Sequence, residues 1–153
     1  MGKGPKIPVM SESEIEISFP NLRTGKYTIT SRSSVEYNCI AWAAGDIETW
    51  WWPDPNSQYF WPDDVPRHES LDAFKIAFEK LGYVECDDYA YEEDFEKIAI
   101  YVDSNSKPTH ASRQLSPGIW TSKLGQIEDI EHPFNGLDGS LYGSIALIMR
   151  RPK

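Results

Sequence analysis

The sequence predicts an α+β domain in which helices come first along the chain and an antiparallel sheet follows. Apolar residues recur with helical spacing between residues 71 and 81. From residue 97 onward, short β-favouring runs are separated by turn signals such as Pro117 and Gly118. The last of these runs, Ile145–Met149, is apolar, as in a central strand covered on both faces. This separation of helices from strands is typical of α+β proteins.

Residues 1–17 are predicted to form a flexible arm, and residues 18–153 a single domain. The arm contains two glycines and two prolines in its first eight residues, and an acidic run follows them. The chain has 153 residues, which suits one domain with its own hydrophobic core and is short for two. Residues 27–30 are expected to form a short extended segment.

The first helix of the domain is predicted at residues 38–45. Asn38 can cap its N-terminus, the alanines favour its interior, and Gly45 can end it. Cys39 then lies in the first turn, where the peptide dipoles can lower the pKa of a thiol from about 8.5 towards roughly 3.5–7.5. The alternative is a buried structural cysteine in a helix that packs against the sheet.

Residues 50–66 contain four tryptophans and four prolines, and they predict a long ordered loop. Trp50 and Trp61 are candidates for an aromatic wall that binds substrate beside Cys39. The alternative is that these rings fill the layer between helices and sheet. An amphipathic helix that begins near Ser70 and ends at Gly82 follows the loop.

Strands are expected at residues 97–103, 110–115 and 119–124, spaced as in an antiparallel meander, and at 143–150. His110 opens the second of them. A thiol nucleophile needs an imidazole within hydrogen-bond reach, and the two residues are usually distant in sequence. Cys39 and His110 are therefore predicted to form a catalytic thiol–imidazole pair. The alternative for His110 is an ordinary polar residue at a strand end.

His132 and Asp129 are the candidates for a third catalytic residue that orients His110, and Ser122 is a further one. No spacing rule selects among them, and His132 is equally interpreted as a loop residue. Zinc bound by Cys39 and the two histidines is a competing hypothesis. No ligand pair has the short-range spacing of a zinc site, so neither a metal nor another cofactor is predicted.

Two more residues of segment 118–125 are candidates for substrate binding, namely Trp120 and Lys123. Lys123 can bind a carboxylate, or it can pair with the acidic surface. Cys86 is excluded as a nucleophile because the two aspartates that follow it disfavour a thiolate.

The composition argues against several classes of partner. The net charge of −9 repels the phosphates of nucleic acids and of anionic membranes, so neither is predicted as a partner. No apolar stretch approaches the length that spans a bilayer, and the N-terminus has no signal-type apolar run. The chain has only two cysteines, which do not make a disulfide framework. A cytoplasmic protein is expected.

Five segments resemble the signature blocks of an uncharacterised bacterial domain family. They follow one another within residues 19–150, so the resemblance covers most of the chain. The segments are YNCIAWAAGD at 37–46, YFWP at 59–62, KIAIY at 97–101, PTHASRQ at 108–114 and GIWTSKLG at 118–125.

More distantly, a cysteine on a helix followed by strands with a histidine is similar to the papain-like, NlpC-type cysteine peptidase superfamily. The resemblance implies a small papain-like domain with N-terminal helices packed on an antiparallel sheet. It also implies a cysteine hydrolase or acyl transferase that acts on an amide or thioester bond of a peptide or protein. In NlpC-type enzymes the catalytic histidine opens the strand that corresponds to residues 97–101. Here that position holds Glu96 and Lys97, and His110 lies on the following strand.

The alternative function belongs to a different class. A small, acidic, tryptophan-rich protein on the same fold suits a non-enzymatic binding or immunity-type role, in which it neutralises a basic protein partner.

Overall fold

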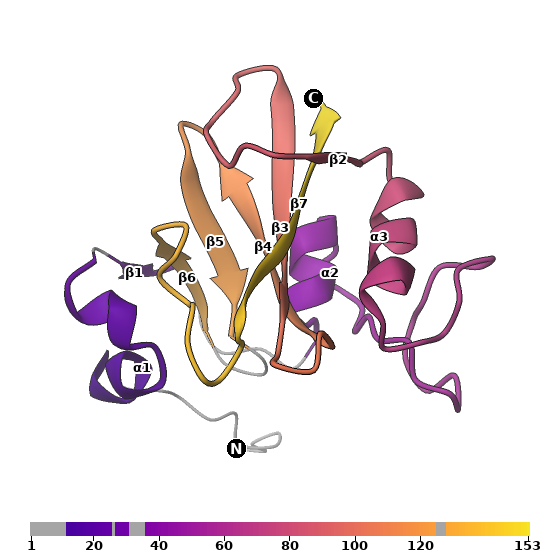
Figure 1. The fold of residues 1–153 in the computed structure, drawn as a ribbon, viewed down its shortest axis with the longest axis horizontal. Coiled ribbons are helices and arrows are strands. Elements are labelled where there is room, and N and C mark those ends of the chain that lie inside the picture. Colours follow the sequence, from indigo (N-terminus) through magenta and orange to yellow (C-terminus); the bar gives the residue numbers. More distant parts are fainter. Residues whose placement is uncertain (1–11, 26, 31–35, 125–127) are drawn as a thin grey trace, which may run out of the picture.

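The structure, a computed structural model, describes residues 12–25, 27–30, 36–124 and 128–153. Within these ranges the chain forms one antiparallel sheet in the strand order β1-β6-β5-β4-β3-β7-β2, with helices packed against it (Figure 1). The predicted α+β class is therefore confirmed. The strands are β1 (Thr28–Ile29), β2 (Val84–Cys86), β3 (Phe95–Val102), β4 (Pro108–Leu115), β5 (Ile119–Lys123), β6 (Asp129–His132) and β7 (Ser144–Pro152). The helices are α1 (Glu12–Ser18), the 3-10 helix η1 (Pro20–Arg23), α2 (Cys39–Ala44) and α3 (Leu71–Glu79).

Helices α2 and α3 lie together on one side of the sheet, and α2 packs on β4 and β5 (Figure 1). Helix α3 begins at Ser70, whose hydroxyl accepts a hydrogen bond from the backbone N–H of Ala73 at 3.2 Å, as its cap signal predicts. The apolar side of α3, two rings of the tryptophan-rich loop and the inward residues of the sheet form what we call the α2-side core. It contains Cys39, Ile40, Ala41, Trp51, Trp61, Phe74, Phe78, Ile98, Ile100, Ala111, Leu147 and Met149, among others.

A second core lies on the opposite face of the sheet, under α1 and η1, and we call it the α1-side core. It contains Ile15, Phe19, Leu22, Ala99, Tyr101, Trp120, Leu124, Ile130 and Leu137. The predicted flexible arm is therefore wrong for residues 12–17, because this segment belongs to a helix whose Ile15 is fully buried. The rest of that prediction, residues 1–11, lies outside the described residues.

The alternation of side chains along β3 and β4 decides which residues meet. Ile100 faces Ala111 across the two strands, and both belong to the α2-side core. The next pair, Tyr101 and His110, therefore points to the other face, and Tyr101 belongs to the α1-side core. The side chains of successive residues of β4 thus point to opposite faces of the sheet.

The last strand differs from its prediction. Its residues Leu147 and Met149 are buried, but Ala146 is exposed and Ile148 only half-buried. The strand is internal, between β3 and β2, but only one face of its middle is well covered, because the α1-side core does not extend to Ala146 and Ile148.

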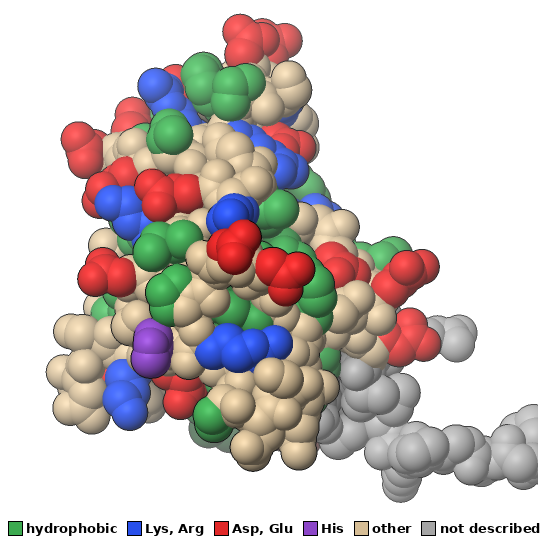
Figure 2. Space-filling view, turned by 90° about the vertical axis from the view of Figure 1, so that its right-hand side faces the viewer, with side chains coloured by type: hydrophobic (Ala, Val, Ile, Leu, Met, Phe, Trp, Pro, Cys, Tyr) green, Lys and Arg blue, Asp and Glu red, His purple; other side chains and the backbone are tan. Residues whose placement is uncertain are grey.

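Charged side chains of both signs are interspersed with hydrophobic ones on the face that Figure 2 shows. No single-sign surface dominates this view, although the chain as a whole is strongly acidic. Among the helices of the described residues, none combines the length and the apolar character needed to cross a bilayer.

Candidate functional site

Cys39 opens helix α2, as predicted, directly after the N-cap residue Asn38. Oδ1 of Asn38 accepts hydrogen bonds from the backbone N–H groups of Ala41 and Trp51, each at 3.1 Å. Its Nδ2 donates to the carbonyl oxygen of Trp51 at 2.6 Å. Asn38 thus fixes both the start of the helix and the loop that carries the tryptophans. The helix ends, also as predicted, at Gly45 in a left-handed conformation with φ of 86°.

The Cys39 side chain lines an open pocket of about 310 Å³, which we call the Cys39 pocket. This volume is at the lower end of those typical of small-molecule sites. Aromatic rings from the tryptophan-rich loop and from the segment before β7 make most of its wall. The lining residues are Asn38, Cys39, Trp50, Trp52, Tyr59, Thr109 and Tyr142. An aromatic wall therefore lies beside Cys39, and it includes Trp50, whose role in binding stays a prediction.

Burial dominates the chemistry of the thiol. It raises the pKa of Cys39 to about 11. The backbone groups of Ala111, Ile40 and Cys39 and the positive charge of Lys123 lower this pKa only in part. The thiol is therefore protonated at neutral pH, and the helix start alone does not produce the expected thiolate.

Lys123 is the charged neighbour of Cys39. Its side chain is fully buried, and its ammonium lies 5.4 Å from the ring centre of Tyr37. Burial lowers the pKa of Lys123, while the charges of Asp129, Glu128 and Cys39 act in the opposite direction. Asp129 faces Lys123 across β5 and β6 and accepts a hydrogen bond from the Tyr37 hydroxyl at 2.7 Å. On sequence grounds Lys123 is a candidate for substrate binding. In the structure its positive charge acts on the thiol of Cys39.

The predicted pair of Cys39 and His110 is not formed. His110 is fully buried on the α1 side of β4, where its ring stacks on Tyr142 with centres 4.0 Å apart. Neither ring nitrogen has a hydrogen-bond partner among the described residues. Burial lowers the pKa of His110 well below its usual value, and the neighbouring His132 lowers it further. The predicted strand lies within β4, but His110 is the third residue of β4 and does not open it, and the alternation of side chains along the strand turns the imidazole away from Cys39.

None of the three candidates for the third residue, His132, Asp129 and Ser122, bonds to His110. His132 bonds instead to the Ser122 hydroxyl through Nε2 and to the Pro133 carbonyl oxygen through Nδ1, both at 2.7 Å. Burial lowers the pKa of His132 to about 4. Asp129 lies on the opposite face of the sheet from the histidines, next to Lys123.

The two other aromatic candidates lie away from the Cys39 pocket. Trp61 is buried in the α2-side core, where it packs on Phe74 and donates from Nε1 to the Pro66 carbonyl oxygen at 3.0 Å. Trp120 is buried in the α1-side core against Phe134. Sequence reasoning instead missed Tyr59 and Tyr142 as aromatic lining residues. Tyr142 could not have been found from a pattern, because it reaches the pocket from a loop 103 positions after Cys39.

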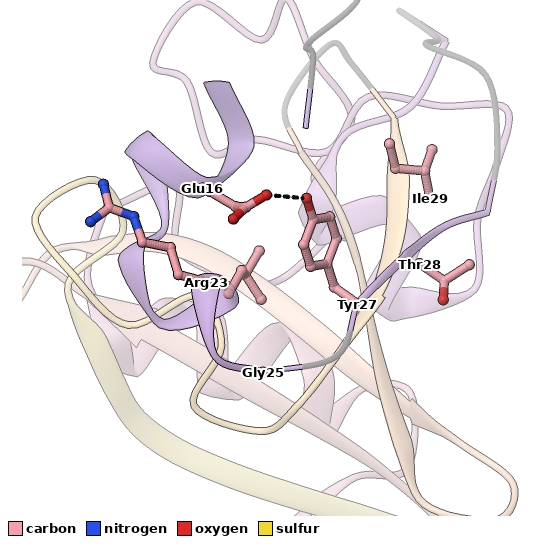
Figure 3. A pocket seen from close by; sticks show the side chains of 7 residues that line it. Glu16, Arg23, Gly25, Tyr27, Thr28 and Ile29 are labelled. Atoms are coloured by element: carbon pink, nitrogen blue, oxygen red, sulfur yellow. Dashed lines mark hydrogen bonds between the residues drawn. The ribbon is translucent and has the colours of Figure 1, made fainter. Parts of the chain in front are cut away.

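A larger hollow of about 700 Å³ lies between α1 and β1, where the Tyr27 hydroxyl donates to Glu16 at 3.0 Å (Figure 3). The described residues of its wall include no thiol or imidazole and none of the candidate site residues that the sequence predicts. In the part of the chain that the structure describes, no three His, Cys, Asp or Glu side chains gather as a metal site requires. The zinc hypothesis is contradicted more directly, because Cys39 and the two histidines occupy opposite faces of the sheet.

Residues 28–150 match a domain family of unknown function, DUF7689. The chain belongs to this family. The DUF7689 match runs from the start of β1 into β7 and includes every residue of the Cys39 pocket, whereas α1 and η1 precede it. Comparisons with curated proteins and with solved structures give no match.

Alkylation of Cys39 by iodoacetamide is expected to accelerate with pH up to a midpoint near 11, because only the thiolate reacts. Replacing Lys123 by methionine removes a positive charge that lowers this pKa, so the midpoint should rise and the rate at pH 9 should fall about threefold to tenfold. Mass spectrometry of a Cys86→Ala background follows the single remaining thiol. A midpoint below pH 8 would show that an activating partner acts on Cys39 after all.

Proposed function

We propose that this DUF7689 domain is a cysteine hydrolase or acyl transferase that acts on an amide or thioester bond, with Cys39 as its nucleophile. The proposal is carried by one observation: the thiol forms part of the wall of an open pocket, and the charge of a buried lysine, Lys123, acts on it. Cysteine nucleophiles in enzymes are activated by a neighbouring base or by positive charge.

In this proposal Lys123 takes the place that the sequence analysis gave to His110. The ammonium of Lys123 lowers the pKa of Cys39, and it equally favours negative charge on the oxygen of a carbonyl that the thiol attacks. The charge of Asp129, which accepts a hydrogen bond from Tyr37, raises the pKa of Lys123 and so acts against the effect of burial. Lys123 is thus a positioning and charge-stabilising residue. The papain-like relationship remains part of the proposal. The catalytic arrangement differs from the Cys–His pair of that superfamily, because a lysine acts on the cysteine in place of a histidine.

The proposed reaction consists of two acyl transfers, first to Cys39 and then to water or an acceptor amine. The sulfur of Cys39 bonds to the carbonyl carbon while the bond from that carbon to the leaving nitrogen or sulfur breaks, and the thiol proton goes to the leaving group. A water molecule or an acceptor amine then attacks the thioester, releases the acyl group and returns a proton to the sulfur. The aromatic walls suit an apolar or planar acyl group of a peptide or another small substrate.

The test uses activated thioesters and aryl esters with aromatic and aliphatic acyl groups. Intact-mass measurements followed by peptide mapping should find the acyl group on Cys39, and turnover should fall at least ~100-fold in Cys39→Ala. Cys86→Ala is the matched control and should keep full turnover. Acylation of Cys86 or of surface lysines alone, or turnover that survives in Cys39→Ala, contradicts the proposal.

A second function is favoured by the raised pKa of Cys39. A protonated thiol in an aromatic pocket without charged lining side chains also suits non-covalent binding of an apolar group. A comparison of wild type with Cys39→Ala distinguishes the two functions. If ligands bind equally to wild type and Cys39→Ala, and Cys39 is never acylated, the domain is a binding protein.

A further inference from the structure

A second, smaller cleft lies at the other end of helix α2, and we call it the Arg113 cleft. It measures about 60 Å³ and lies between the end of α2, β3, β4 and β7. Three of its lining residues are basic, Lys97, Arg113 and Arg151, and one is acidic, Glu96. A cationic cleft is unexpected in a chain with a net charge of −9.

Two of the three basic side chains already have partners. Arg151 donates from Nε to Glu96 at 2.6 Å and from Nη1 to the Leu81 carbonyl oxygen at 2.8 Å. Nζ of Lys97 donates to two backbone carbonyl oxygens at 2.7 Å each and lies 2.8 Å from a Glu92 carboxylate oxygen. The acid of the cleft, Glu96, is therefore neutralised by Arg151, and the fixed charges of these neighbours roughly cancel.

Arg113 differs from both. Its guanidinium stacks over the ring of Trp42, with 4.0 Å between its central carbon and the ring centre. It makes no hydrogen bond or ion pair with another residue in the described ranges, and its Nε is buried without an acceptor. Nε1 of Trp42 is likewise buried and without an acceptor in the described part of the chain. Trp42 does not line the cleft, so the Nε of Arg113 is the buried donor without an acceptor that belongs to a lining residue, and such a donor favours a group that supplies oxygen lone pairs.

We propose that the Arg113 cleft binds a small oxyanion group, a carboxylate or a phosphate, through the guanidinium of Arg113. Arginine presents a planar fork of donors that matches both groups. The volume of the cleft corresponds to about four or five water-sized positions, which is the size of one such group. The site is independent of the Cys39 pocket, because the two occupy opposite ends of α2 and share no lining residue.

The indole of Trp42, which stacks on Arg113, allows anion binding to be followed by NMR. In ¹⁵N-labelled full-length protein, the Trp42 indole resonance, assigned with Trp42→Phe, is followed while sodium phosphate or sodium acetate replaces sodium chloride at constant ionic strength. A saturable shift with either anion is expected. Arg113→Gln should weaken the apparent affinity at least ~10-fold, since it removes the charged fork. Lys107→Gln removes an exposed positive charge elsewhere and should leave the affinity unchanged.

The outcomes are distinct. Saturation by acetate alone narrows the ligand class to carboxylates, and saturation by phosphate alone narrows it to phosphates. No saturable shift with either anion overturns the proposal, because ordinary water then satisfies the donors. An unchanged affinity in Arg113→Gln overturns it as well. If that variant does not fold, Arg113→Lys, which keeps the charge and loses the fork, should give an intermediate affinity.

Discussion

Gly143→Ala is expected to lower the free energy of unfolding by about 3–5 kcal/mol, through backbone strain and overpacking together. Gly143 has a φ of 82°, and a Cβ built there would lie 1.9 Å from the carbonyl oxygen of Val102. The backbone of β3 cannot move away, since Val102 pairs with Ser144 in the next position of β7. Urea denaturation of the purified protein measures the change. The substitution should also disturb Tyr142, which precedes Gly143 and lines the Cys39 pocket.

Gly45→Ala is the control that separates the energetic penalty of a left-handed alanine from the penalty of a steric clash. Gly45 has nearly the same φ, 86°, but the nearest atom to its added Cβ is Nη1 of Arg113 at 3.8 Å. Its expected loss is only about 1–2 kcal/mol, the penalty of a left-handed alanine. Equal losses in the two variants would mean that the contact with Val102 relaxes without a penalty.

Asn38→Ala is expected to lower the free energy of unfolding by about 2–4 kcal/mol, because one truncation removes a helix cap and leaves a buried N–H and C=O unpaired. Those groups belong to Trp51, whose loop then loses its anchor to α2. The thiol of Cys39 should become more accessible as the loop loosens, so alkylation at pH 9 should be faster than in wild type. Thermal unfolding and alkylation rates measure the two effects.

Asn38→Ser keeps a side-chain oxygen that can cap Ala41 and loses both hydrogen bonds to Trp51. It should therefore keep the helix cap and show a smaller loss than the alanine variant. A loss as large as that of Asn38→Ala would assign the stabilisation to the bonds with Trp51, and the capping argument would fail.

Local signals predicted the elements that have both a cap and a periodicity. Helix α2 runs between its predicted cap Asn38 and Gly45, and the meander of β3, β4 and β5 has the predicted order. Four elements were missed, namely α1, η1, β2 and β6. Each is short, and α1 and β6 carry acidic residues that resemble a solvated segment. Their formation depends on contacts with distant parts of the chain, such as the burial of Ile15, which no local pattern shows.

The site was predicted less completely, for a geometric reason. The position of Cys39 follows from one helix signal, and the neighbouring aromatic loop follows from chain continuity. Which face of β4 receives His110 depends on the register with β3, and a shift of one residue exchanges the faces. The same register brings Lys123 to the thiol through β5. The chemistry of the pocket therefore depends on strand pairing that residue types alone do not specify.

The position of β7 has a consequence for biosynthesis. This strand is the last of the sheet in chain order, yet it lies between β3 and β2 and supplies Leu147 and Met149 to the α2-side core. Until residue 149 has emerged, β3 has one unpaired edge and the apolar sides of α2 and α3 cover an incomplete sheet. While β7 is still missing, the nascent domain exposes apolar surface and a free strand edge, the condition in which chains bind chaperones or aggregate. The sheet of this domain is therefore completed only when its last strand is available, whatever the speed of its individual helices.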